Sequence, residues 1–160
     1  MNKSDNTYIE SFRVKSKSYS DASVLMHEAV ARAAGLSGAD HKYLGLLIEK
    51  EEATAGELSR LTGLTTGAVT GLIDRLEKKG LATRKFDKGD RRKVIIVPDV
   101  ENTKKLLEPV FSDLQKKTLQ LVSSFTEEEL AIVGNYFSHA TEIMKEVTNS
   151  LNSKTTRDDE

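Results

Sequence analysis

The chain has 160 residues, of which 38% are hydrophobic and 31% are charged, and its formal net charge is -1. This length suffices for one well-buried domain over residues 1–160, and nothing in the composition indicates a second independent core. Because the sequence has no cysteine, a disulfide framework, a thiolate metal site and a cysteine-based oxidant sensor are excluded.

The hydropathy of the sequence predicts the cellular location of the protein. The first residues, MNKSDNTY, are polar, and the longest aliphatic run is Val94 to Val97. A membrane-spanning helix needs about 20 apolar residues, and a signal peptide needs its own apolar stretch. We therefore expect a cytoplasmic protein with no membrane partner.

Residues 7–34 are predicted to form a long helix that packs against other helices. Their apolar side chains recur at spacings of three and four with one break at Lys15, which is typical of a helix-packing seam. Gly35–Gly38 then supply a turn, and a shorter helix is predicted over residues 40–50. The seam of the long helix consists of Tyr8, Phe12, Tyr19, Ala22, Met26, Ala29 and Ala33.

A third helix is predicted to begin near Ala55. Thr54 and Glu57 have the spacing of a capping box, in which each side chain bonds a backbone N–H at a helix start. Gly63 stands where a left-handed residue commonly ends a helix. Only the turn Gly63–Thr65 then separates this helix from the next one.

The next helix, which is predicted to end at Lys79 and Gly80, has two contrasting faces. An apolar stripe on one face is formed by Val69, Leu72, Ile73 and Leu76. Small side chains on the opposite face belong to Thr66, Gly67, Thr70 and Gly71. Each glycine costs a helix about 0.5 to 1 kcal/mol relative to alanine, so two on an exposed face favour close approach to another molecule. Small hydroxylated side chains suit a major groove, where threonine can bond to bases or phosphates.

A basic hairpin follows from Leu81 onward, where the apolar period changes to two. Strands are predicted over residues 81–86 and 93–97, with Asp87–Arg92 as the loop. Between Arg75 and Lys93 there are nine lysines or arginines and three acidic residues, a local balance of +6 in a chain of net charge -1. Two short helices and a basic hairpin form a winged helix-turn-helix arrangement, and this concentration of cations is typical of a DNA-binding protein.

Two other classes of protein share parts of this pattern. A basic loop alone is usually a solvated surface, and helix-turn-helix patterns also occur in protein-interaction modules. The combination of capped helix, short turn, small-residue face and basic hairpin favours DNA binding. The alternatives that stay open are a winged-helix protein-interaction module and a nonspecific architectural DNA-binding protein.

Helical periodicity returns over residues 100–151. Pro109 is predicted to kink or break the first part. Thr126 and Glu129 form a second capping box. The helix that they start carries an apolar seam of Leu130, Val133, Phe137, Ala140, Met144, Val147 and Leu151. The polar residues 152–160 are predicted to form a flexible tail.

The long helical regions, residues 7–34 and 100–151, are predicted to be dimerisation helices. One recognition helix reads only a few base pairs, whereas a two-fold dimer places two such helices about 34 to 36 Å apart, one turn of B-DNA. A homodimer on a pseudo-palindromic site is therefore expected. The alternative is that these helices close a monomeric bundle.

Other chemistry finds little support in the sequence. His27, His41 and His139 are scattered, and neither His27 with Glu28 nor His139 with Glu142 makes a convincing zinc set. No nucleophile elbow, P-loop or dinucleotide fingerprint is present. We expect no enzymatic activity, no cofactor and no metal, with a regulatory metal as the alternative role of the histidines.

The segment TTGAVTGLIDRLEKKGLATRKFDKGDRRKVIIV resembles the recognition helix and wing of the MarR family of bacterial transcription regulators. The resemblance covers roughly residues 40–100, and its specific parts are L-x-x-x-T-G-L-T-x-G-x-V-T, D-R-L-E-K-K-G and the D-R-R wing tip. It agrees with a mainly α fold with a small β-hairpin wing. In this fold a winged helix-turn-helix, residues 40–98, is flanked by N- and C-terminal dimerisation helices.

The resemblance also implies roles for individual residues. It places Thr66, Gly67 and Thr70 in the major groove and gives Arg75 a phosphate contact. Arg92 would enter the minor groove while Asp90 holds it, and a narrow A/T-rich minor groove attracts arginine. The full set of candidate DNA-binding residues is Thr65, Thr66, Gly67, Thr70, Gly71, Arg75, Lys78, Lys88, Asp90, Arg91, Arg92 and Lys93.

Members of this family are most often repressors, and small molecules, often aromatic acids, bind between their dimer helices and their DNA-reading region. The resemblance therefore implies a ligand-responsive repressor. Tyr19, Tyr43 and Phe111 are the candidate ligand-binding residues, although aromatic residues at helical spacing more often belong to a core.

Overall fold

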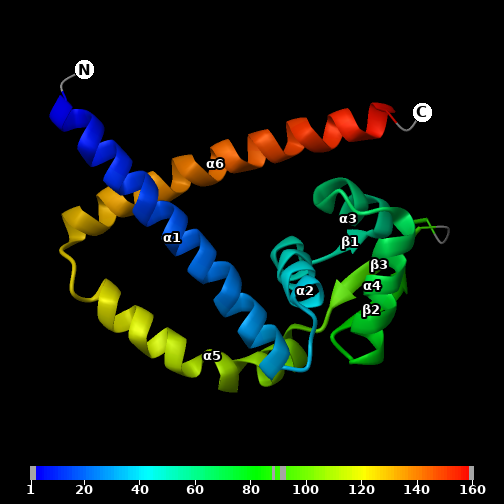
Figure 1. Cartoon of the computed structure of the whole chain (residues 1–160). Coiled ribbons are helices and arrows are strands. Elements are labelled where there is room, and N and C mark those ends of the chain that lie inside the picture. Colours follow the sequence, from blue (N-terminus) through cyan, green and yellow to red (C-terminus); the bar gives the residue numbers. More distant parts are fainter. Residues whose placement is uncertain (1–2, 88, 91–92, 159–160) are drawn as a thin grey trace.

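The computed structural model of the chain describes residues 3–87, 89–90 and 93–158, and it is mainly α-helical with one small sheet (Figure 1). This architecture confirms the predicted fold class. The elements in chain order are α1 (Lys3–Ala33), α2 (Gly38–Lys50), β1 (Ala53–Thr54), α3 (Ala55–Thr62), α4 (Thr66–Lys78), β2 (Ala82–Phe86), β3 (Val94–Pro98), α5 (Val100–Val122) and α6 (Glu127–Asp158).

A compact lobe contains α2, α3, α4 and the sheet, and it holds most of the buried core. The predicted apolar stripe of α4 is buried completely or almost completely. It packs against side chains from α2, α3, β3 and the start of β2, so this lobe forms around one face of α4. The buried partners of the stripe include Leu44, Leu47, Leu58, Leu81, Ala82 and Ile96.

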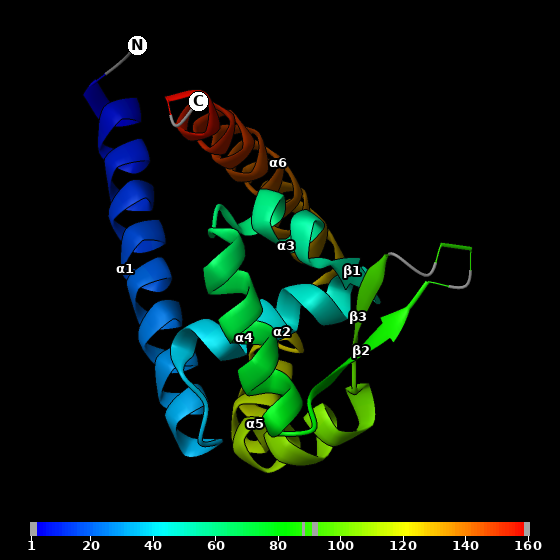
Figure 2. The same cartoon turned by 90° about the vertical axis from the view of Figure 1, so that its right-hand side faces the viewer.

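The sheet is antiparallel, with strand order β1-β3-β2. The hairpin lies close to its predicted bounds, and Phe86 pairs with Val94 at its outer end. Strand β1, in which Ala53 pairs with Ile96 and Thr54 with Ile95, is not predicted by the sequence pattern. A strand of two residues is too short to show an alternating pattern. Figure 2 shows the hairpin of β2 and β3 projecting from the lobe.

The predicted helix ends are confirmed in detail. The capping box of α3 is complete, with 2.7 Å from the Thr54 nitrogen to Glu57 Oε2 and 3.2 Å from the Glu57 nitrogen to Thr54 Oγ1. Gly63 ends this helix with φ of +72°, in the left-handed region that glycine adopts without strain. The capping box of Thr126 and Glu129 is also present, with 2.9 Å from the Thr126 nitrogen to Glu129 Oε2 and 3.2 Å from the Glu129 nitrogen to Thr126 Oγ1.

The structure agrees with the predicted kink at Pro109 and corrects the prediction of a flexible tail. Pro109 does not break α5, which is continuous from Val100 to Val122, although Figures 1 and 2 together show that α5 changes direction along its length. A helix of this length tolerates the loss of one backbone hydrogen bond at proline by bending. Helix α6 continues past residue 151 to Asp158, because no glycine or proline stops it, so residues 152–158 of the predicted flexible tail are helical.

The long helices α1, α5 and α6 form an open frame beside the lobe (Figure 1). Helix α1 crosses α6, and the rings of Phe12 and Tyr136 meet edge to face there with centroids 4.9 Å apart. Away from this crossing, many large apolar side chains of α1 and α6 are exposed. None of the helices within the described residues is both long enough and apolar enough to cross a membrane.

Candidate nucleic-acid interface

The turn between α3 and α4 is held by side-chain hydrogen bonds. Ser59 Oγ donates to the Leu64 carbonyl at 2.6 Å, and the Leu64 nitrogen donates to Thr62 Oγ1 at 3.2 Å. Thr65 caps α4, since its hydroxyl oxygen accepts a bond from the Ala68 nitrogen at 3.3 Å. Serine and threonine thus fix the angle at which α4 leaves α3.

The small-residue face of α4 is open. Thr66, Gly67 and Thr70 are exposed, and Gly71 is half-exposed. A Cβ added at Gly67 would meet no atom within 4 Å, and the residue has an ordinary helical backbone. Neither steric space nor backbone conformation in this chain therefore requires glycine there. The Thr70 hydroxyl donates to the Thr66 carbonyl at 2.9 Å, so toward another molecule it can act only as an acceptor.

Arg75 makes a contact that the sequence did not reveal. Its Nε lies 3.0 and 3.1 Å from the two carboxylate oxygens of Asp40, and its Nη2 lies 2.7 Å from Asp40 Oδ1. Asp40 is only 3% exposed and lies in the first turn of α2. Lys79 adds a bond of 2.8 Å to the carbonyl of Gly35, just before α2. Both contacts tie α4 to the start of α2.

The environment of Asp40 stabilises its charged form. Burial acts to raise the pKa of the Asp40 carboxyl, but hydrogen bonds from Arg75 and Ser37, with the charges of Arg75 and Lys79, outweigh burial. The pKa of Asp40 therefore lies below its ordinary value. In the folded protein, the Asp40 carboxylate is therefore charged, paired with Arg75 and hydrogen-bonded.

Arg84 also bonds within the chain, from β2 to α4. Its Nη2 donates to Asp74 Oδ1 at 2.6 Å, and its Nη1 donates to a carboxylate oxygen of Glu77. The backbone nitrogen of Arg84 donates to the other oxygen of Glu77 at 2.7 Å. Arg84 therefore connects α4 to the hairpin by both its main chain and its side chain.

Asp87 shapes the hairpin loop. Its carboxylate accepts hydrogen bonds from the backbone nitrogens of Gly89, at 2.7 Å, and Asp90, at 2.9 Å. Backbone bonds from Asp90 and Gly89, with the charge of Lys93, lower the pKa of Asp87 despite the opposing effect of burial. This local turn positions the start of the loop.

The predicted DNA-binding cations differ in how the structure places them. Lys78 and Lys93 are exposed, whereas the guanidinium of Arg75 is paired with Asp40. Lys88, Arg91 and Arg92 lie outside the described residues, and so does the predicted contact of Asp90 with Arg92. Of the nine cations counted in the sequence, the structure describes six, and among these Arg75, Lys79 and Arg84 donate to groups of their own chain.

The three candidate ligand-binding aromatics do not form one site. Tyr19 is 65% exposed and its ring lies 6.3 Å from that of Phe137, whereas Tyr43 packs against the core of the lobe. Phe111 lies beside a hollow of about 480 Å³ between α2 and α5. The lining of this hollow is Ile48, Val100, Thr103, Lys104, Leu107, Glu108, Phe111 and Gln115.

The prediction that all three histidines are scattered is wrong for two of them. The rings of His27 and His41 lie 5.5 Å apart, and Phe111 stacks on His41 at 6.0 Å. Burial and the charge of His27 lower the pKa of His41, with the opposing charge of Glu28 too weak to reverse the shift. The described part of the chain contains no group of three metal-ligating side chains.

Several contacts of the structure could not be predicted from the sequence. Asp40 and Arg75 are separated by 35 positions, and the His27–His41 contact joins two helices, so neither contact follows a local spacing rule. The spacing of Asp74 and Glu77 was a sequence signal for a binding partner of these two residues, because carboxylates three positions apart share one helix face. The aspartate that precedes Lys88 and Gly89 was a second signal, typical of an Asx turn.

Comparison with known proteins identifies relatives. A family model described as MarR family matches residues 34–93. The HTH-type transcriptional regulator YcgE of Bacillus subtilis, itself described as uncharacterized, is 45% identical over 123 residues, which span 77% of this chain and 79% of YcgE. MhqR, an HTH-type transcriptional regulator of the same organism, is 29% identical over 143 residues, which span 89% of this chain and 91% of MhqR. These relatives are described as transcription regulators and not as enzymes.

Solved structures share the fold. A MarR family protein from Bacillus stearothermophilus aligns with a TM-score of 0.66 and 23% identity over 90% of this chain and 98% of its own. The transcriptional regulator Tm0710 from Thermotoga maritima aligns with a TM-score of 0.62 and 24% identity over 88% of this chain and 98% of its own. At these identities the likeness concerns the architecture.

The Asp40–Arg75 pair predicts how stability depends on pH. Since folding lowers the pKa of Asp40, the ion pair stabilises the fold above the unfolded value of about 4 and is lost as the pH falls through the lower folded value. We expect Asp40→Asn to lower the free energy of unfolding at pH 7 by about 1 to 3 kcal/mol. Urea unfolding at several pH values should show that the difference in free energy of unfolding between the wild type and Asp40→Asn shrinks below about pH 4.

Asp113→Asn is the matched control, because Asp113 pairs with Lys117 on an exposed face of α5. An exposed pair contributes about 0 to 1 kcal/mol, so this variant should follow the wild type. Equal losses in the two variants, or a difference for Asp40→Asn that grows on acidification, would contradict the assignment.

Proposed function

Because the chain belongs to the MarR family of helix-turn-helix transcription regulators, we propose that it acts as a homodimer on a pseudo-palindromic DNA site. The proposal rests most directly on the exposed small-residue face of α4, since the fold itself gives no reason for Gly67. A two-fold dimer presents this face twice, at a spacing that can match successive major grooves.

Within this proposal, different residues supply specificity and affinity. Thr65, Thr66, Gly67 and Thr70 would face base edges, and the wing arginine Arg92, held by Asp90 as in the family motif, would enter the minor groove. Exposed cations would neutralise phosphates and make binding strongly dependent on salt. The proposed phosphate-contacting residues are Lys78, Lys88, Arg91 and Lys93.

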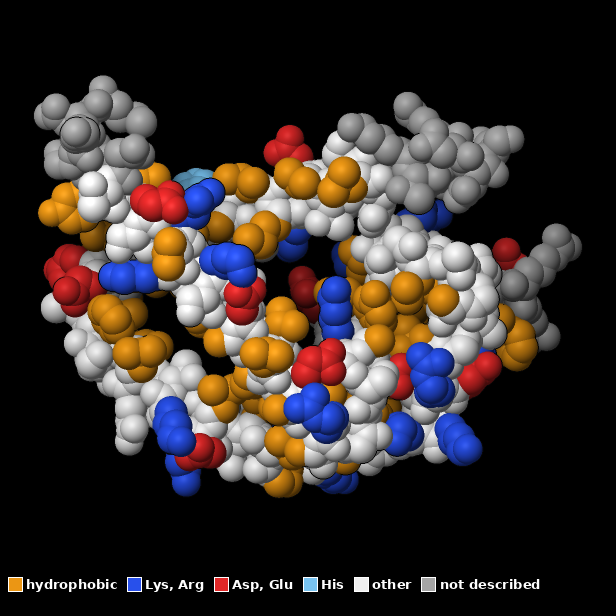
Figure 3. Space-filling view, in the orientation of Figure 1, with side chains coloured by type: hydrophobic (Ala, Val, Ile, Leu, Met, Phe, Trp, Pro, Cys, Tyr) orange, Lys and Arg blue, Asp and Glu red, His pale blue; other side chains and the backbone are white. Residues whose placement is uncertain are grey.

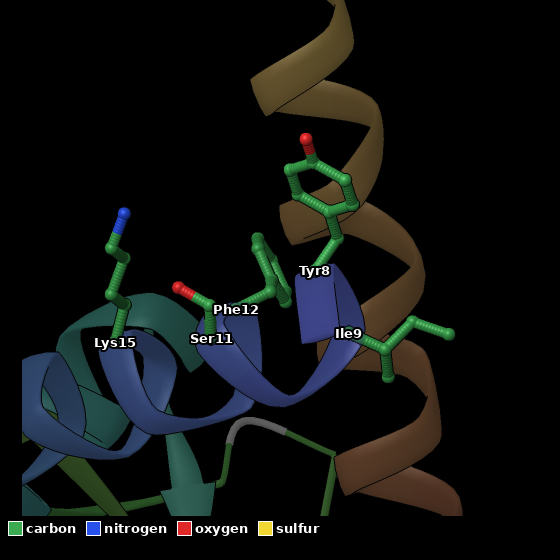
Figure 4. Close-up of a pocket in the computed structure, with 5 residues that line it drawn as sticks. All are labelled: Tyr8, Ile9, Ser11, Phe12 and Lys15. Carbon is green, nitrogen blue, oxygen red and sulfur yellow. The ribbon is translucent and has the colours of Figure 1, made fainter. Parts of the chain in front are cut away.

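The homodimer is supported by the apolar surface of the long helices. A monomer rarely exposes a contiguous apolar patch larger than a few hundred Å². Figure 3 shows hydrophobic side chains gathered along these helices, and on the predicted seam of α6 Met144 is 69% exposed and Leu151 is 58% exposed. The apolar surface also includes a hollow of about 490 Å³ near the start of α1 (Figure 4). Its lining consists of Tyr8, Ile9, Ser11, Phe12 and Lys15.

We also propose that the protein is a repressor that responds to a small molecule. The hollow beside Phe111 lies between α2, which belongs to the lobe, and α5, which belongs to the frame. A ligand there would change DNA affinity only if it bound two arrangements of lobe and frame with different affinity. We choose this hollow as the candidate effector site because its lining residues come from both the lobe and the frame.

Selection of bound duplexes from a random pool tests the proposed function. We expect enrichment of a two-fold symmetric sequence whose half-sites are centred about 10 base pairs apart. Salt-dependent binding without enrichment would instead indicate an architectural DNA-binding protein, and no duplex binding at all would indicate a protein-interaction module.

Gly67→Ala separates the requirements of the fold from those of DNA recognition. Alanine should raise the free energy of unfolding by about 0.5 to 1 kcal/mol, since its methyl group meets no atom of the chain. The same methyl group should weaken binding to the selected duplex by roughly 1 to 3 kcal/mol, measured by fluorescence anisotropy.

Gly45→Ala in α2 is the control for this effect, because a Cβ at Gly45 also meets no atom within 4 Å. It should stabilise the fold without a loss of DNA affinity. Full DNA affinity in Gly67→Ala would show that α4 does not approach the duplex closely.

Sedimentation equilibrium tests the dimer. The wild type should sediment at twice the chain mass of 17.7 kDa at micromolar concentration. The double variant Met144→Glu/Leu151→Glu should sediment at the mass of a single chain, because carboxylates cannot be buried cheaply in an apolar interface. Lys145→Glu, next to the seam, should stay dimeric, and a monomeric wild type would refute the dimer.

A further inference from the structure

We propose that Arg84 is a positioning residue for DNA recognition, which with Asp74 and Glu77 forms a clasp that fixes the angle between the wing and α4. In this role Arg84 does not contact phosphate, although it lies in the most basic part of the chain. The inference rests on the proposed function and gives Arg84 a role that neither the sequence motif nor the charge count indicated.

The contacts of the clasp join main chain to side chain. Asp74 and Glu77 lie three residues apart on α4 and therefore share one face of the helix. Arg84, on β2, reaches both carboxylates with separate guanidinium nitrogens, and its backbone nitrogen donates to Glu77. A planar guanidinium that donates to two fixed acceptors restricts direction as well as distance. Glu77 thus holds the strand itself and not only a flexible side chain.

The clasp acts as a second point of attachment for the wing. The first point is the turn after α4, where the Leu81 nitrogen donates to the Leu76 carbonyl at 2.9 Å and Gly80 adopts a left-handed φ of +68°. A hairpin held only at this turn could swing about it. Arg84 lies farther along β2, so bonds from there to α4 remove that freedom.

The edge position of β2 explains why Glu77 can bind the strand. Strand β2 pairs only with β3, so one of its sides has no partner strand among the described residues. The backbone N–H of Arg84 donates to Glu77 instead of to a strand. A carboxylate on an outward-facing N–H also opposes pairing with another chain. Glu77 therefore satisfies a donor that the sheet leaves open.

The charges of the clasp are matched. Arg84 is 34% exposed as a side chain, and its two acidic partners offset its charge. Hydrogen bonding to Asp74 is the largest cause that raises the pKa of the Arg84 guanidinium, against partial burial and with further help from Glu77. A cation with two carboxylate partners has little charge to offer a phosphate. The clasp also accounts for Glu77, an acidic residue in a strongly basic segment.

Positioning matters because two elements must reach DNA together. The recognition helix and the wing approach neighbouring grooves of one duplex, and a site loosened by about 1 Å loses much of its function. Positioning and direct contact predict opposite results when the negative charge of Glu77 is removed. Loss of a carboxylate near DNA strengthens phosphate binding by electrostatics alone, whereas loss of the clasp weakens recognition.

The test uses Glu77→Gln and Arg84→Gln, with Lys85→Gln as the matched control. Lys85 is the neighbouring exposed cation on the same strand, so its variant removes the same charge as Arg84→Gln without touching the clasp. Affinity for the selected duplex is measured over a range of salt concentrations. Hydrogen exchange of the β2 and β3 amides is measured in the DNA-free proteins, after circular dichroism has verified that the helices are intact.

We expect Glu77→Gln and Arg84→Gln each to weaken duplex binding by roughly fivefold to tenfold and to speed amide exchange in β2. The slope of log affinity against log salt should stay at the wild-type value in Arg84→Gln, whereas loss of a phosphate contact would lower it by about one. Lys85→Gln, which leaves the clasp intact, should keep the wild-type rate of amide exchange in β2.

Tighter binding by Glu77→Gln, with a reduced salt slope in Arg84→Gln, would overturn the proposal and make Arg84 a phosphate contact. Unchanged amide exchange in both variants would equally overturn it, because the clasp would then not hold the wing. A wild type that binds no duplex would contradict the proposed function, while the exchange measurement would still decide whether the clasp exists.

Discussion

The burial of one apolar stripe on α4 decides which face of this helix points outward. Val69, Leu72, Ile73 and Leu76 fall on one face of the helix and are removed from water by α2, α3 and the sheet. Full burial of each such side chain contributes about 1.5 to 3 kcal/mol, so rotation of the helix about its axis is strongly opposed. The opposite face, with Thr66, Gly67 and Thr70, therefore has to face outward.

Ion pairs then hold α4 in place relative to the elements around it. The Asp40–Arg75 pair ties α4 to the start of α2, and the Asp74–Arg84–Glu77 contacts tie it to β2. Two of the arginines in the basic segment thus act within the chain, which leaves fewer cations for phosphates than a count of charges implies. Apolar packing sets the rotation of the helix, and polar contacts set its relation to the neighbouring elements.

The sequence predicted the features that depend on local spacing. Capping boxes, the glycine at the end of α3 and the apolar stripe of α4 all follow from residues within two helical turns of one another, and the structure confirms them. The partners of Arg75 and Arg84, the neighbouring rings of His27 and His41, and β1 depend on chain segments that meet only in the fold. Local periodicity carries no information about such meetings, so these features needed coordinates.

Hydroxyl-radical footprinting of the wild-type protein on its selected duplex measures most directly whether paired copies of α4 and the wing read DNA. The account predicts two protected windows on one face of the duplex, centred about one helical turn apart. One window alone, or protection spread evenly along the duplex, would contradict it.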